Sequence, residues 1–164
     1  MISKLLDADA LGIRLEIMGG LPVWEPHPLW KHQKAIDRIR ATIETTPPAT
    51  HAQKSCDCIH ASDVYVKFPD GSLKRPDISI FCREPDEEDK PVTLVPEAVI
   101  EILSKGYEAK DLEIAPRFYL SQGVNDVVVF DPYTLVVLHV RKDQANRMVS
   151  PVEIEFECGC RCTV

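Results

Sequence analysis

The sequence predicts an α/β or α+β fold in which a mixed β-sheet is flanked by helices. Short runs of apolar, β-branched residues alternate with polar residues at period two, as in residues 76–82, which is typical of strands. Residues 29–43 instead place apolar side chains at helical spacing. Because strand-like runs stand before and after helical ones, one sheet covered by helices is the expected architecture. At 164 residues the chain is expected to form a single domain, residues 1–164, with a cysteine-rich C-terminal tail.

The N-terminal half is divided by glycine and proline turns. In chain order we expect a helix over residues 3–12, strands over 13–18 and 21–24, a helix over 29–43, a linker over 45–50 and a strand over 61–68. Gly19-Gly20 provides a tight turn between the first two strands. Pro47-Pro48 cannot continue a helix, so the second helix ends before the linker.

The C-terminal half returns to strands after one helix. We expect strands over residues 76–82, 98–103, 126–131, 135–140 and 152–156, an acidic loop over 83–91 and a helix within 108–122. Pro116 cannot lie deep inside that helix, so the helix is expected to begin near Ile114 or to kink there. Gly123 is placed to end it.

Two of these strands each carry one carboxylate in an apolar surrounding. Asp77 lies at the start of the strand over residues 76–82, and Glu101 interrupts the apolar run from Ala98 to Leu103. A buried carboxylate is costly unless it is paired, protonated or bound to a metal. If the two strands pair as a hairpin, Asp77 and Glu101 converge on one cation. Two hard oxygen ligands are a typical protein contribution to a Mg²⁺ site.

A series of short motifs follows the same order as a known nuclease family. The motifs are Arg14 to Leu21, His32, Pro76-Asp77, Glu101-Ile102-Leu103-Ser104, Tyr119, Gly123-Val124 and Asp131-Pro132. This ordered set resembles the PD-(D/E)XK nuclease superfamily, and within it the small bacterial family of restriction-endonuclease-like proteins known as Uma-two. The resemblance covers roughly residues 5–140, and it implies a restriction-endonuclease-like fold.

The resemblance implies a metal-dependent DNA endonuclease that hydrolyses phosphodiester bonds with Mg²⁺ or Mn²⁺. It assigns Asp77 and Glu101 as metal ligands and catalytic residues. It also implies that the Ile102 backbone carbonyl and Glu16 complete the ligand shell. DNA is the expected substrate.

The expected lysine of this family pattern is absent. The lysine that ends the PD-(D/E)XK motif would fall at Leu103. The family's other lysine position, four residues before Tyr119, falls at Ala115. Lys105 and Lys110 lie nearby as candidate substitutes. Three explanations stay open: one of these lysines takes the role, the site binds metal without efficient chemistry, or alanine is not the natural residue at position 115. We therefore expect impaired cleavage.

Three further features have two interpretations each. From its pattern alone, Glu16 is a solvated strand residue, whereas the resemblance makes it a third acidic group near the metal. His32 lies on the apolar stripe of its helix, where a packed and hydrogen-bonded histidine is the default, although the family often has a histidine there. The same helix carries basic residues that form either a solvated face or a contact to nucleic-acid phosphate: Lys31, Lys34, Arg38 and Arg40.

The cysteines lie in two clusters and one strand. They are Cys56, Cys58, Cys82, Cys158, Cys160 and Cys162. In a cytosolic protein disulfides are not expected, so the paired Cys-x-Cys segments raise the question of a structural zinc site. Its candidate ligands are Cys56, Cys58, Cys158, Cys160 and Cys162. This spacing is tighter than the usual Cys-x₂₋₄-Cys, so reduced, unliganded thiols are the default expectation.

Composition and charge restrict the remaining function classes. The net charge of −7 argues against broad, non-specific affinity for nucleic acid but leaves room for a local basic groove. No apolar run reaches the length of a membrane helix and no signal-peptide core is present, so a cytoplasmic protein without membrane association is expected. The alternatives to an endonuclease are a catalytically silent homodimeric or nucleic-acid-binding protein on the same scaffold, and a small adaptor held together by zinc.

Overall fold

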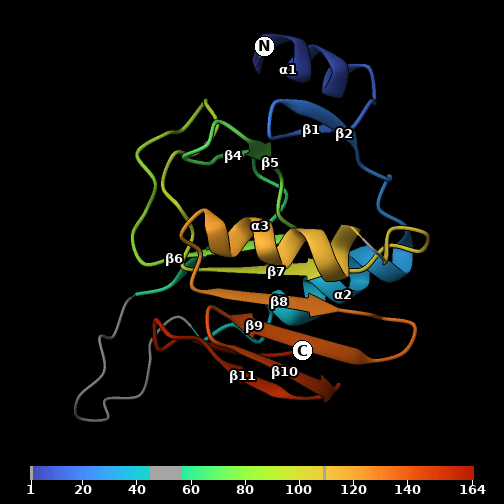
Figure 1. Ribbon diagram of the computed structural model, residues 1–164, viewed down its shortest axis with the longest axis vertical. Helices are drawn as coiled ribbons and strands as arrows, with labels where there is room; N and C mark the ends of the chain where they lie inside the picture. Colours follow the sequence, from blue (N-terminus) through green and yellow to red (C-terminus); the bar gives the residue numbers. More distant parts are fainter. Residues whose placement is uncertain (1, 45–56, 109) are drawn as a thin grey trace.

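A six-stranded mixed sheet forms the centre of the molecule (Figure 1). The structure is a computed structural model and describes residues 2–44, 57–108 and 110–164. Across the sheet the strands are β10 (Gln144–Val149), β9 (Val136–Arg141), β8 (Asp126–Phe130), β7 (Ala98–Ile102), β6 (Ile78–Phe81) and β3 (Ile59–Ala61). β7 and β8 run parallel, and the other neighbouring strands of this sheet run antiparallel.

Two smaller sheets are attached to this centre. One has the strand order β2 (Leu21–Trp24), β1 (Leu15–Met18), β5 (Leu73–Lys74) and β4 (Val66–Lys67). Figure 1 shows it at one end of the molecule, below the N-terminal helix α1 (Ile2–Ala10). The other is the hairpin of β11 (Glu153–Glu155) and β12 (Arg161–Thr163) near the C-terminus.

Helices cover both faces of the central sheet because its inner strands are apolar on both sides. On one face, α2 (Trp30–Arg40) packs Ile36 and Ile39 into a cluster that contains Ile100. On the other face, α3 (Ala115–Ser121) packs Tyr119 against Val99. A π-helical turn, Lys110–Ile114, precedes α3, and Pro116 lies in the first turn of α3, where the missing N–H is tolerated.

The structure confirms the predicted fold class and corrects some of its elements. The expected strand over residues 61–68 is wrong: β3 ends at Ala61, and β4 belongs to a different sheet. Asp63 between them has φ +58°, a left-handed conformation that breaks an extended strand. The sequence prediction also missed β5, β10 and β12. The predicted linker lies within residues 45–56, outside the described residues.

No helix in the described part of the chain has the length and apolar character needed to cross a membrane.

Buried Asp126 joins the central sheet to the segment that follows β11. Its Oδ1 lies 2.6 Å from Nε2 of His139 and accepts a 2.5 Å hydrogen bond from Nε of Arg141. Its Oδ2 accepts a 2.8 Å hydrogen bond from the backbone N–H of Glu157. Burial alone would raise the pKa of Asp126, but these hydrogen bonds outweigh it and hold the pKa below its ordinary value.

We expect Asp126→Asn to lower the free energy of unfolding by about 2–3 kcal/mol at pH 7, because a buried carboxylate loses charged hydrogen bonds. Because its pKa is lower in the folded state, Asp126 contributes stability above its unfolded pKa of about 4. That contribution is lost as the pH falls through the folded pKa. Urea unfolding at several pH values measures both effects, with the exposed Asp143→Asn as control. Equal acid sensitivity in Asp126→Asn and the unaltered protein would contradict this role.

Candidate active site

The pairing of β6 with β7 brings the two predicted carboxylates together. Ile78 lies opposite Ile100 in this antiparallel pair, so Asp77 lies beside Glu101 where β6 begins and β7 ends. The backbone N–H of Asp77 donates to Oε2 of Glu101 at 3.3 Å. The backbone N–H of Ile102 donates to Oδ2 of Asp77 at 2.7 Å. The predicted pairing of the two strands, with Asp77 beside Glu101, is confirmed, and their convergence on one cation stays a prediction.

A small polar cavity of about 20 Å³ opens onto these carboxylates. A site needs roughly 10–15 Å³ to hold one water, so this volume suits a single small ion or a water. The acidic residues lining the cavity are Glu16, Glu25, Asp77, Glu101 and Asp111. Arg14, Arg75 and His32 also line it.

Glu101 lies in an environment that opposes its charge. Burial and the neighbouring charge of Asp77 raise the pKa of Glu101 well above its ordinary value, although Lys74 acts in the opposite direction. The hydroxyl of Tyr119 donates to Oε1 of Glu101. Burial and the charge of Glu101 raise the pKa of Tyr119 as well, so this side chain remains a hydroxyl donor. A cation at the cavity would favour the ionised form of Glu101.

A buried ion pair between Lys74 and Glu16 lies next to these carboxylates. Nζ of Lys74 lies 2.5 Å from Oε2 of Glu16, with the residues 2% and 1% exposed. Oε1 of Glu16 accepts a 2.7 Å hydrogen bond from the backbone N–H of Arg75. The interpretation of Glu16 as a solvated strand residue is therefore wrong. Both carboxylate oxygens of Glu16 are thus hydrogen-bonded, one to Lys74 and one to Arg75. In this conformation Glu16 affects the cavity through its negative charge and through these two contacts.

His32 reaches the site from the first turn of α2. Its Nε2 lies 3.2 Å from Oδ2 of Asp77, and the ring also forms a hydrogen bond with the backbone of Ile102. Burial would lower the pKa of His32, but the hydrogen bond and charge of Asp77 raise it above its ordinary value. Within the described residues, its buried Nδ1 has no hydrogen-bond partner. His32 is thus packed and hydrogen-bonded, as expected by default, and its partner is the carboxylate of Asp77; a catalytic role for it stays a prediction.

The oxygen ligands suit a hard divalent cation held by few protein groups. Among the described residues, no three carboxylate or histidine ligand atoms all lie within 4.8 Å of one another. The protein therefore offers the adjacent Asp77 and Glu101 rather than a cage. Mg²⁺ commonly binds through one or two carboxylates and keeps several waters, so this donor set fits it.

None of the predicted lysine positions places a described ammonium group in the cavity. Ala115 is 3% exposed and lies one helical turn before Tyr119 on the same face of α3. Leu103 is buried, and Lys105 is exposed in the turn after β7. The side chain of Lys110 lies outside what the structure describes.

Sequence reasoning missed two charged residues near the carboxylates. Lys74 carries no pattern signal, because its strand β5 is only two residues long. Asp111 lines the cavity and accepts a 3.4 Å hydrogen bond from the backbone N–H of Ser104. Asp111 comes directly after Lys110 in the π-helical turn, which the sequence does not distinguish from ordinary helix.

The cysteines depart from the expectation of unpaired thiols. Cys58 and Cys160 form a disulfide, with their Cα atoms 6.5 Å apart, a separation that a disulfide allows. Cys158 and Cys162 are buried free thiols. Cys56 lies outside the described residues. The side chains of Cys58, Cys158, Cys160 and Cys162 belong to the α2 side of the sheet rather than to the carboxylate cavity.

Comparisons with known proteins show the family and the fold of this chain. The model of the Uma2 family, described as "Putative restriction endonuclease", matches residues 3–157. One similar solved structure is described as the crystal structure of a putative nuclease belonging to DUF820 from Anabaena variabilis ATCC 29413. It superposes with a TM-score of 0.63 and 20% sequence identity, covering 86% of this chain and 80% of that one. At this identity the likeness establishes the fold. A search of curated proteins found no match.

We expect Lys74→Met to lower the free energy of unfolding by about 3–5 kcal/mol, because it leaves the buried Glu16 carboxylate without its cation. The double variant Lys74→Met/Glu16→Gln should lose less than the sum of the two single variants, since it removes the unpaired charge. Urea unfolding of the four proteins gives the coupling free energy. The exposed Lys67→Met in the neighbouring strand is the control. Strict additivity would show that the two residues do not interact.

Proposed function

We propose, since this chain belongs to the Uma2 family of putative restriction endonucleases, that it is a divalent-metal-dependent DNA endonuclease with impaired chemistry. The observation that carries the proposal is the juxtaposition of Asp77 and Glu101 at one small polar cavity. Asp77 and Glu101 would hold Mg²⁺ or Mn²⁺, with the Ile102 backbone carbonyl as a further ligand. A homodimer and a cytoplasmic location remain predictions.

Phosphodiester hydrolysis needs an activated water and neutralisation of the charge that develops on the phosphate. A bound divalent cation supplies both. The protein keeps the two carboxylates in place through the backbone N–H groups of Asp77 and Ile102 and the Tyr119 hydroxyl. Lys74 lies behind Glu16 and is not among the residues that line the cavity, so we assign it a positioning role.

A basic, partly aromatic surface beside the site supports DNA as the substrate. Lys31, Lys34 and Arg38 of α2 line a groove of about 400 Å³ together with Trp30, whose side chain is largely exposed. The same helix carries His32 into the cavity. Basic side chains position nucleic-acid phosphates, and aromatic faces stack on bases. On a chain with net charge −7, such contacts are confined to a local surface.

A second candidate function, a catalytically silent nucleic-acid-binding protein, is favoured by one observation. Ala115 stands where the family pattern has a lysine, so the site lacks the cation expected to offset transition-state charge. This candidate keeps the metal site and the basic groove but performs no cleavage. The two functions differ in their response to restoring the lysine.

We expect isothermal titration calorimetry to detect Mn²⁺ binding in the millimolar to sub-millimolar range, because few charged ligands compete with a strongly hydrated ion. Asp77→Ala should abolish the binding heat. Asp86→Ala, in the exposed acidic loop, is the control for adventitious binding and should leave the heat unchanged. Equal heats from Asp77→Ala and the unaltered protein would contradict the metal assignment.

We expect weak or undetectable plasmid nicking by the chain as it stands with Mn²⁺, and at least about tenfold faster nicking by Ala115→Lys. One electrostatic contact made only in the transition state is worth about 10²–10³ in rate. Position 115 lies on the same face of α3 as Tyr119, whose hydroxyl reaches Glu101, so a lysine there should point toward the carboxylates. Metal binding should stay nearly unchanged.

The nicking series needs two controls. Ala115→Lys combined with Glu101→Gln measures contaminating nuclease, and circular dichroism verifies that a lysine at this buried position leaves the protein folded. A folded Ala115→Lys that cleaves no faster than its Glu101→Gln counterpart would refute the lysine placement. The alternative outcome is that the unaltered chain cleaves efficiently and loses this activity in Lys105→Ala or Lys110→Ala. That result would identify the substituted lysine as the one that takes the role of the missing lysine.

A further inference from the structure

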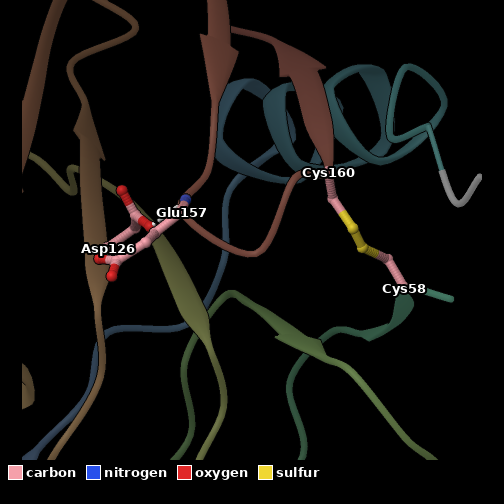
Figure 2. Close-up of a disulfide and its surroundings, with 4 residues drawn as sticks. All are labelled: Cys58, Asp126, Glu157 and Cys160. Carbon is pink, nitrogen blue, oxygen red and sulfur yellow. Dashed lines mark hydrogen bonds between the residues drawn. A yellow bond between two sulfur atoms is a disulfide. The ribbon is translucent and has the colours of Figure 1, made fainter. Parts of the chain in front are cut away.

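Three buried cysteines from distant parts of the chain meet beside the C-terminal hairpin. Cys58 comes directly before β3, and Cys158 and Cys160 lie in the turn between β11 and β12. Their three sulfur atoms all lie within 4.8 Å of one another. The structure joins two of them, Cys58 and Cys160, in a disulfide (Figure 2), and leaves Cys158 as a free thiol.

The backbone around Cys158 and Cys160 is fixed independently of the disulfide. The N–H of Phe156 donates to the carbonyl oxygen of Cys160 at 2.9 Å, and the N–H of Gly159 donates to that of Phe156 at 2.8 Å. Gly159 has φ +92°, a conformation that glycine adopts without strain. These bonds make a tight turn that keeps the sulfurs of Cys158 and Cys160 in one cluster.

The central sheet anchors the start of this turn. The backbone N–H of Glu157 donates to the buried carboxylate of Asp126 in β8 (Figure 2). Asp126 is itself held by His139 and Arg141 of β9. Cys58, on the other side of the cluster, precedes the strand β3 at the edge of the same sheet. Both chain segments that supply sulfurs are therefore positioned by the sheet.

The arrangement of the sulfurs matches a metal site better than a disulfide alone. A disulfide requires two sulfurs, whereas here a third buried sulfur, that of Cys158, lies within 4.8 Å of both. In a tetrahedral zinc site with Zn–S bonds of about 2.3 Å, neighbouring sulfurs lie roughly 3.8 Å apart. Three sulfurs within 4.8 Å reach that geometry through small side-chain movements. Soft thiolates on a preorganised turn select Zn²⁺ over the hard cations that suit the carboxylate cavity.

We propose that the reduced cluster binds one Zn²⁺ through the thiolates of Cys58, Cys158 and Cys160, with a fourth ligand completing the tetrahedron. The disulfide and the zinc complex are then alternative states of the same cysteines. A phosphine reductant converts the Cys58–Cys160 disulfide to two thiols, taking the oxygen of one water as its oxide while the two hydrogens go to the sulfurs. Zn²⁺ then displaces the protons of the three thiols to solvent.

The site would have a structural role. It ties the edge strand β3 to the C-terminal hairpin across a sequence separation of 102 residues. A cluster that holds distant segments together contributes its binding free energy to folding. Because these cysteines do not line the carboxylate cavity, zinc binding here can be measured separately from the proposed nuclease activity.

The test uses the full-length protein, reduced with a phosphine, loaded with Zn²⁺ and separated from free metal by gel filtration. Elemental analysis should find about one zinc per chain in the unaltered protein and in Cys162→Ser, whose buried sulfur lies outside the cluster. Cys158→Ser should retain less than about a tenth of that amount. Cys158→Ser keeps both partners of the disulfide, so it separates metal binding from disulfide formation.

A second measurement follows the same three proteins without depending on retained metal. Co²⁺ added to the reduced protein should give the thiolate-to-metal absorption band with the unaltered chain and Cys162→Ser, and a chelator should lower their melting temperatures by several degrees. Cys158→Ser, verified as folded by circular dichroism under non-reducing conditions, should show neither effect. No zinc and no Co²⁺ band in the reduced unaltered protein would overturn the proposal, as would equal binding by Cys158→Ser.

Discussion

The pairing of β6 with β7 is the constraint on which the rest of the site depends. It places Asp77 and Glu101 side by side at the end of an otherwise apolar pair of strands. Two neighbouring carboxylates away from bulk water repel each other and resist ionisation, which is why the pKa of Glu101 lies well above its ordinary value. Two such carboxylates stay in place only if hydrogen-bond donors and positively charged groups nearby offset their repulsion and their burial.

The small sheet provides much of that compensation. Glu16 of β1 binds Lys74 of β5, and the positive charge of Lys74 acts on Glu101 as well. Arg75, directly after β5, binds Asp63 and Asp9, so the connection after β3 and the helix α1 join the same charge network. Ion pairs next to the carboxylates therefore hold together the small sheet, the connection after β3 and α1. This explains why charged residues are buried at a boundary that an apolar core could otherwise have filled.

The parts of the fold that sequence reasoning found are those whose side chains alternate clearly or form a continuous apolar run. Residues 76–82 and 126–131 carry β-branched runs, and both contain strands of the central sheet. Strand β10 was missed because Gln144–Val149 is largely exposed and half of its residues are polar, so its sequence shows no regular alternation of apolar and polar residues. Glu16 was misread for a related reason. A single acidic residue in a strand looks solvated, and only the distant Lys74, 58 positions later, makes its burial possible.

Local sequence pattern predicted the candidate site only as far as the two carboxylates define it, whereas Glu16 and His32 were indicated by the family resemblance alone. Asp77 and Glu101 interrupt apolar strands, which is a local signal. The contact between His32 and Asp77 depends instead on how α2 crosses the sheet, and this crossing cannot be predicted from the residue pattern of either segment. The meeting of Cys58 with Cys160 likewise follows from the placement of β3 and the C-terminal hairpin in the tertiary fold.

Helix α2 connects the two chemically distinct centres of the molecule. Its first turn holds His32 against Asp77, while Ile36 and Ile39 pack in the cluster that contains Cys58 and Cys160. Just after the helix, the Thr42 hydroxyl accepts a 2.8 Å hydrogen bond from the backbone N–H of Thr163 in β12. The C-terminal hairpin thus supports the helix that carries a side chain into the carboxylate site. A disulfide or a metal that holds the hairpin in place therefore also helps to hold α2, the helix from which His32 reaches Asp77.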